Sequence, residues 1–128
     1  MCVTAGCDFL EEGPELEQFE FQESTPGVTV QPSIDAADIG ASIGLIGQLN
    51  TPSPCHRLRA SLEQSGSQLT VRVVATPTGS DCENIVGNFR YTGAIRNVSD
   101  GTYQLRVRHS FEGSSWESYE FNVSVTVR

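Results

Sequence analysis

The 128-residue sequence has no lysine and no arginine before Arg57. It also lacks a run of about 18 apolar residues, so we expect no part of it to cross a membrane as a helix. Its net charge of −8 argues against general nucleic-acid binding, which needs a basic surface that displaces counterions from phosphates. All eight basic residues are arginine, which we interpret first as a coding bias and second as a preference for bidentate contacts with anions.

Groups that carry catalysis or bind metals are also scarce. The only two histidines, His56 and His109, take inward positions at or near the ends of predicted strands, so we expect both to be structural. A nucleophilic triad could be built only from His109, a serine and either Asp100 or Glu117, and no Gly-x-Ser-x-Gly turn supports it. The two histidines also lack the spacing of a metal site. We therefore predict no enzymatic activity, no metal and no cofactor.

Charge divides the chain into two parts. Residues 1–56 hold nine acidic residues and no arginine, whereas residues 57–128 hold eight arginines and seven acidic residues. From Asp8 to about Ser24 the chain has too few apolar residues to offset the entropy of folding, which predicts a solvated tether. Within it, Phe19-Glu20-Phe21 could add a short edge strand. We expect 1–27 to be a leader remnant and acidic tether, and 28–128 to be a β-sandwich domain.

The second part shows the alternation of apolar and polar residues that is typical of half-buried β-strands. Ile34–Asp38, in contrast, is predicted to be a helical turn, and Gly93 is predicted to mark a bend or bulge. The predicted strands are 42–50, His56–Glu63, Leu69–Thr76, Val86–Arg96, Thr102–Phe111 and Glu117–Val127.

Two hairpins can be aligned by their inward faces. In the last hairpin, one register that matches the faces sets Val107 opposite Phe121 and Arg108 opposite Glu120, a favourable charge pair. In the first, a symmetric turn around Ser65-Gly66 places Arg59 opposite Arg72, with Arg57 diagonal to them. Like charges in this arrangement repel one another, so either the side chains splay into solvent or reach Glu63, or an acidic partner lies between them. That partner would be the chain's own acidic tether or a polyanionic surface ligand.

The first hairpin also predicts a disulfide. Cys55 precedes its first strand and Cys82 follows its second, so both cysteines fall at the same end. A disulfide there would contribute about 3.5 kcal/mol by the chain-entropy relation. It would also indicate an oxidising, extracytoplasmic compartment.

The stretch Asp100-Gly101-Thr102-Tyr103-Gln104-Leu105 resembles immunoglobulin-like domains, in which a turn rich in Asp and Gly precedes a tyrosine that caps the corner before a strand. This resemblance implies that Tyr103 is the corner tyrosine. Leu105 stands where antibody domains carry a core cysteine, and fibronectin-type and transthyretin-like sandwiches share the Gly-Thr-Tyr strand. The predicted fold class is therefore all-β, an antiparallel immunoglobulin-like sandwich of about seven strands with an extended acidic N-terminal arm.

The opening Thr4-Ala5-Gly6-Cys7 resembles the lipobox of bacterial lipoproteins, in which small residues precede a cysteine that is lipidated after signal-peptide cleavage. On this resemblance Cys7 is the lipidation site, Met1–Gly6 is the remnant of a signal peptide, and the protein lies in the cell envelope, periplasmic or on the outer surface, or is secreted. Alternatively, Cys2 and Cys7 are ordinary thiols or a local pair.

These features predict a non-catalytic binding or structural module of the cell envelope, lipid-anchored, that contacts the membrane only through its anchor and binds no nucleic acid. The candidate binding residues are Arg57, Arg59, Arg72 and Trp116. Their expected partner is an unknown protein or a polyanionic or carbohydrate surface ligand. Trp116 either contacts that partner or folds back onto the sheet. The alternative function is an inhibitor that blocks a protease or other hydrolase with the end loops of the sandwich.

Overall fold

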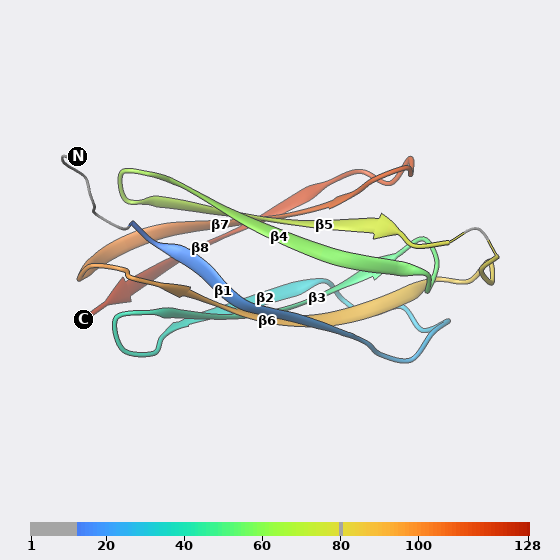
Figure 1. Ribbon diagram of the computed structural model, residues 1–128, viewed down its shortest axis with the longest axis horizontal. Coiled ribbons are helices and arrows are strands. Elements are labelled where there is room, and N and C mark those ends of the chain that lie inside the picture. The colour runs from blue at the N-terminus through green and yellow to red at the C-terminus, as the bar shows by residue number, and fades with distance from the viewer. Residues whose placement is uncertain (1–12, 80) are drawn as a thin grey trace.

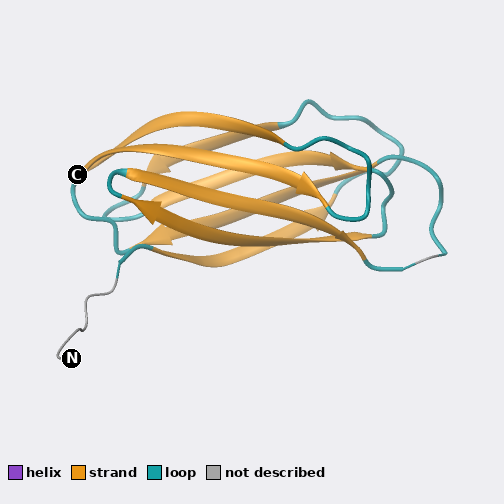
Figure 2. Ribbon diagram, turned by 90° about the horizontal axis from the view of Figure 1, so that it is seen from above, coloured by secondary structure: helices purple, strands orange, loops and turns teal. Residues whose placement is uncertain are grey.

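The computed structural model describes residues 13–79 and 81–128. Two four-stranded sheets pack face to face, with the strands running along the long axis of the molecule (Figures 1 and 2). The first sheet contains, in spatial order, β1 (Glu15–Glu23), β6 (Gly87–Arg96), β3 (Ile43–Thr51) and β2 (Ser33–Asp38). The second contains β4 (His56–Ser65), β5 (Gln68–Pro77), β7 (Gly101–Phe111) and β8 (Tyr119–Val127). The predicted all-β sandwich is confirmed.

The core lies between the two sheets and follows the alternation in the sequence. Along β7, every second residue from Tyr103 to Phe111 is buried, and the residues between them are more exposed. Because one face of each sheet must leave water, this period of two decides which residues enter the core. The fully buried core side chains include Ile43, Leu45, Leu49, Leu69, Val71, Val73, Tyr91, Ile95, Leu105, Val107 and Val127.

The strand β1 corrects the prediction of a solvated tether for residues 15–23. It pairs antiparallel with β6, and its residues Leu16 and Phe19 pack against the core. Residues three apart in a regular strand point to opposite faces, but a bulge at Gln18, whose φ is 57°, brings both onto the inner face. The bulge lies opposite Gly93, where an added Cβ would be 3.3 Å from Leu16 Cδ1. The short edge strand that was the alternative is therefore present and longer than expected.

The second correction concerns Ile34–Asp38, which forms the strand β2 rather than a helical turn. β2 pairs antiparallel with β3. Ile34 and Ala36, two residues apart, are partly buried against the core, which is the spacing of a strand rather than a helix.

The registers of the two hairpins differ in how well they were predicted. Between β7 and β8, Val107 lies opposite Phe121 and Arg108 lies opposite Glu120, as predicted. Between β4 and β5 the register is shifted by two residues, because the turn is made by Gly66 and Ser67, with Gly66 at a φ of 62°. A shift of two leaves every side chain on its predicted face but changes its partner across the strands.

One neighbouring pair of strands is parallel rather than antiparallel. After β5 the chain crosses to the first sheet as β6 and returns as β7, so β5 and β7 run in the same direction and lie side by side. The other paired strands in the described part of the chain are antiparallel. The parallel pair decides which outward side chains become neighbours at the centre of the second sheet.

Candidate functional site

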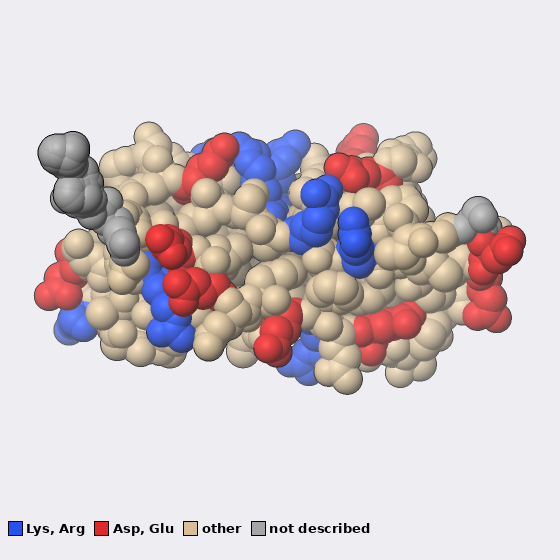
Figure 3. Space-filling model, viewed as in Figure 1, with Lys and Arg blue, Asp and Glu red and all other residues tan. Residues whose placement is uncertain are grey.

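The outer surface of the second sheet carries most of the positive charge of the protein. Five of the eight arginines lie on it, on three adjacent strands. We call this surface the arginine face, and its arginines are Arg57 and Arg59 of β4, Arg72 of β5, and Arg106 and Arg108 of β7. In the space-filling view, basic side chains gather over β4 and the sheet to which it belongs (Figure 3).

The parallel register places Arg72 directly beside Arg108 at the centre of this face. The prediction that Arg59 lies opposite Arg72 is wrong, because the register shift places Arg59 opposite Val74. Two like-charged residues are therefore neighbours on the arginine face, but on β5 and β7. Sequence reasoning missed Arg106 and Arg108 as members of this surface, although their alternation does indicate that they point outward.

Glutamates on the flanking strands draw the two central arginines apart. Arg72 Nη2 lies 2.9 Å from Glu63 Oε1 of β4, and Arg108 Nη1 lies 2.9 Å from Glu120 Oε2 of β8. Arg108 also donates from Nη2 to Ser118 Oγ, at 2.6 Å. The two guanidinium groups are thus held toward opposite edges of the sheet, and the contact of Arg72 with Glu63 is one of the predicted alternatives.

The remaining ion pairs on this face are longer. Arg59 Nη2 lies 3.4 Å from Glu112 Oε2, and Arg106 Nε lies 3.6 Å from Glu120 Oε1. Side chains in these pairs keep between about a third and two thirds of their surface in solvent. Exposed pairs of this kind contribute roughly 0–1 kcal/mol each to stability, so a ligand can displace the glutamates from the arginines.

A shallow groove of about 640 Å³ runs over this part of the sheet. We call it the arginine groove, and its lining includes Arg72, Arg106, Arg108, Glu63, Glu120 and Thr70. A second hollow of about 470 Å³ lies toward β4 and is lined by Arg59, Ala60, Ser61, Arg72 and Val74. Arg72 lines both the arginine groove and this second hollow, so the two hollows are adjacent on the arginine face.

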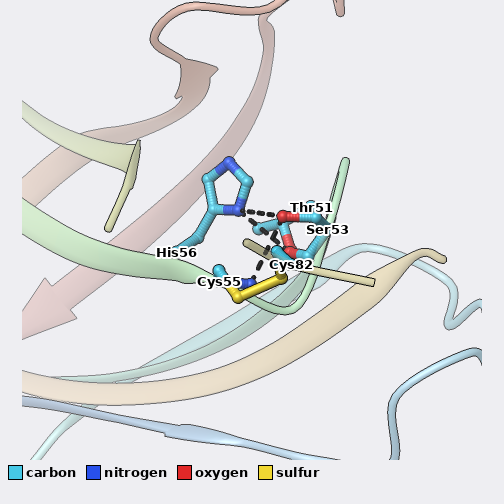
Figure 4. Close-up of a disulfide and its surroundings, with 5 residues drawn as sticks. All are labelled: Thr51, Ser53, Cys55, His56 and Cys82. Carbon is cyan, nitrogen blue, oxygen red and sulfur yellow. Dashed lines mark hydrogen bonds between the residues drawn. A yellow bond between two sulfur atoms is a disulfide. The ribbon is translucent and has the colours of Figure 1, made fainter. Parts of the chain in front are cut away.

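The predicted disulfide between Cys55 and Cys82 is present at one end of the sandwich (Figure 4). The Thr78 N–H donates to the Cys55 carbonyl at 3.0 Å, which ties the two chain segments together next to the disulfide. His56 is buried beside it, with Nδ1 2.9 Å from the Ser53 carbonyl, so this histidine has the predicted structural position (Figure 4).

Trp116, the candidate contact residue in the loop before β8, packs its ring edge-on against Phe111, with the ring centroids 5.4 Å apart. It nevertheless remains 41% exposed. Trp116 therefore both folds back onto the domain, which was one predicted alternative, and keeps a surface that a partner could contact, which was the other. Tyr103 Oη donates to the Ser99 carbonyl at 2.8 Å, four residues upstream, which is the contact expected of a corner tyrosine.

His109 is completely buried between the sheets, where its Nε2 lies 2.7 Å from the Tyr91 hydroxyl. The rings of Tyr119 and Phe121 pack edge-on against it. Burial lowers the pKa of His109 to about 4 and raises the pKa of Tyr119 to about 12, because the charged form of each group is poorly solvated there. The inward position was predicted, whereas the hydrogen bond to Tyr91 was not.

Several other predictions can be placed only in part. Cys7, the predicted lipidation site, lies outside the described residues. The part of the chain that the structure describes contains no cluster of three or more His, Cys, Asp or Glu side chains arranged to hold a metal ion. It also contains no helix long and apolar enough to cross a membrane. Comparison with protein families, curated proteins and solved structures finds no match for this chain.

Proposed function

We propose that this protein is a non-catalytic module of the cell envelope that binds an acidic partner through the arginine face. The observation that carries the proposal is the segregation of charge. In a chain with a net charge of −8, five of eight arginines lie on one surface of one sheet. A positive surface on an acidic protein selects an anionic partner and orients it, while the rest of the molecule repels that partner.

The disulfide supports an extracytoplasmic site of action. The Cys55–Cys82 disulfide is typical of oxidising compartments outside the cytoplasm. The strand β1 begins opposite Arg96, at the end of the sandwich away from the disulfide. We propose that Cys7 carries the lipid, so the anchored segment precedes β1, which enters the domain at the end away from the disulfide. This anchor, and the relation to small bacterial lipoproteins with an immunoglobulin-like domain, are part of the proposal.

Binding to defined polymers tests the proposed function. We would immobilise polyglutamate, dextran sulfate and oligogalacturonate and measure binding of the full chain by interferometry. The double variant Arg59→Ser/Arg72→Ser is expected to weaken binding to at least one of them. Arg90→Ser/Arg96→Ser, which removes the same charge from the opposite sheet, is the matched control and should bind like the unchanged protein. If no anionic polymer binds, or the two variants behave alike, the proposal is wrong.

A specific observation favours a second candidate, an inhibitor of a protease or other hydrolase. The segments 52–55, 81–86 and 112–118 all connect strands at the disulfide end, where Trp116 remains exposed. A loop that is restrained by a disulfide loses little conformational entropy when it enters the active-site cleft of an enzyme. A stable stoichiometric complex with a hydrolase, lost in Trp116→Ala, would support this function. Full enzymatic activity across a panel of proteases and glycosidases at excess protein would exclude it for those enzymes.

A further inference from the structure

We propose that the arginine groove binds an acidic oligosaccharide, with a sugar carboxylate placed between Arg72 and Arg108. This inference rests on the proposed function and narrows its ligand to one chemical class. It concerns the parallel pair β5–β7 rather than the β4 side of the arginine face.

The first step is the unusual position of the two arginines, which are in register on neighbouring strands. Neighbouring strands lie about 4.8 Å apart. Arg72 and Arg108 are in register on β5 and β7, so their outward side chains leave the backbone about one strand spacing apart. Two positive charges in that arrangement repel each other. Glu63 and Glu120 hold them toward opposite edges of the sheet, and both arginines line the arginine groove, where an anion can reach them.

The second step is the supply of free hydrogen-bond donors. A guanidinium has five N–H donors. Among the described residues, Arg72 engages an acidic side chain only through Nη2, and Arg106 makes only long contacts of 3.5 and 3.6 Å through Nε. Donors therefore remain available for a carboxylate, which arginine recognises in a bidentate geometry. Exposed ion pairs with Glu63 and Glu120 are weak enough for such a ligand to compete.

The third step is the mixed chemistry of the groove. Three arginines share it with two glutamates and with hydroxyl and amide side chains that include Thr70 and Gln68. The glutamates would repel a polyphosphate or polysulfate, but they accept hydrogen bonds from sugar hydroxyls. An acidic sugar supplies both partners, because its carboxylate accepts from arginine and its hydroxyls donate to the glutamates. The groove therefore suits alternating hydroxyls and carboxylates better than a densely charged polymer.

The fourth step is the absence of apolar anchors on this surface. The exposed large hydrophobic side chains of the described residues lie outside the outer face of the second sheet, and they are Phe21, Val28, Ile39, Ile46, Ile85 and Trp116. Protein interfaces are usually centred on such side chains, and single-stranded nucleic acids stack their bases on aromatic rings. The arginine groove offers neither, which favours a hydrophilic, non-stacking ligand.

Titration of the full chain with oligogalacturonate, followed by backbone amide NMR, tests this inference. We expect shifts concentrated at residues 68–72 and 104–108. The double variant Arg72→Gln/Arg108→Gln should bind about tenfold more weakly or worse, because it removes charge-assisted hydrogen bonds. Arg90→Gln/Arg96→Gln makes the same change in net charge on the other sheet and should bind within about twofold of the unchanged protein. Thermal unfolding of both variants verifies that they are folded.

Two further probes separate the acidic sugar from general attraction to anions. Methyl-esterified oligogalacturonate keeps the hydroxyls but loses the charges, and polyglutamate keeps carboxylates but has no hydroxyls. Weaker binding of both supports the inference. Equal binding of either probe, shifts confined to the Trp116 loop, or no binding of oligogalacturonate would overturn it. If polyglutamate alone binds through the arginine face, this inference fails while the proposed function stands, and if no anionic polymer binds, both fail.

Discussion

Tyr91 and His109 face each other across the interior of the sandwich, with the tyrosine hydroxyl 2.7 Å from His109 Nε2. Tyr91 belongs to β6 of the first sheet and His109 to β7 of the second, so one polar contact joins the two layers. His109 Nδ1 has no hydrogen-bond partner within the described residues. Protonation would therefore bury a charged ring with one N–H unsatisfied, which explains why the pKa of His109 is low.

We expect the stability of the protein to fall as the pH drops below neutral. The pKa of His109 is about 4 in the folded state and about 6.5 when unfolded, so the unfolded chain binds more protons between these values. The free energy of unfolding should decrease by about 3 kcal/mol from pH 6.5 to pH 4. Tyr91 and Tyr119, which contact His109, titrate far above this range. Urea unfolding at several pH values measures the effect, and His109→Phe should flatten the curve; an equally steep curve in that variant would assign the slope to other groups.

The Gly47→Ala substitution is expected to destabilise the fold. A Cβ at this position would overlap the ring of Tyr91, which is almost completely buried, so the ring or the backbone must shift. We expect a loss of about 1–3 kcal/mol or more from overpacking. Gly44→Ala is the matched control on the same strand, because the three atoms nearest to its Cβ would belong to the exposed Ile39 side chain, the closest at 3.3 Å. Urea midpoints of the two variants compare them directly, and similar losses in both would contradict the packing argument.

Removal of the disulfide should lower stability without affecting the arginine face. The bridge spans 27 residues of sequence, which corresponds to about 3.5 kcal/mol by the chain-entropy relation. We expect Cys55→Ser/Cys82→Ser to lose about this amount in urea unfolding and to bind anionic polymers as the unchanged protein does. The chain treated with a reductant should resemble the variant. Unchanged stability after verified reduction would show that the interstrand hydrogen bonds already hold this end together.

The Tyr103→Phe substitution should cost about 1 kcal/mol of stability, because it removes the hydroxyl that donates to the Ser99 carbonyl. Tyr119→Phe is the control, since no hydrogen bond of the Tyr119 hydroxyl is found among the described residues. Thermal unfolding distinguishes the two variants. A similar shift in both would mean that the corner hydrogen bond contributes no more than the loss of a hydroxyl from a ring.

Sequence alone identified most strands of this protein and the faces of their side chains. Alternation with a period of two carries this information locally, as in β7. Matching the inward faces limits a hairpin register to steps of two residues, and the predicted register that pairs Arg108 with Glu120 is confirmed. The disulfide followed from the same reasoning, because both cysteines lie next to the ends of one hairpin. Each strand must place its apolar side chains on one face, so this requirement is visible as alternation within the short stretch of sequence that forms the strand.

The tertiary structure decided how β1 pairs and which strands are neighbours, because local sequence patterns do not contain this information. The acidic strand β1 is held by the bulge at Gln18 and by packing on Gly93, neither of which appears in the periodicity of its residues. The order of strands in a sheet depends on how distant segments pack. For that reason only the fold shows that Arg72 lies beside Arg108 on a parallel pair of strands. The sequence determined that these side chains point outward, and the pairing of β5 with β7 determined that they are neighbours.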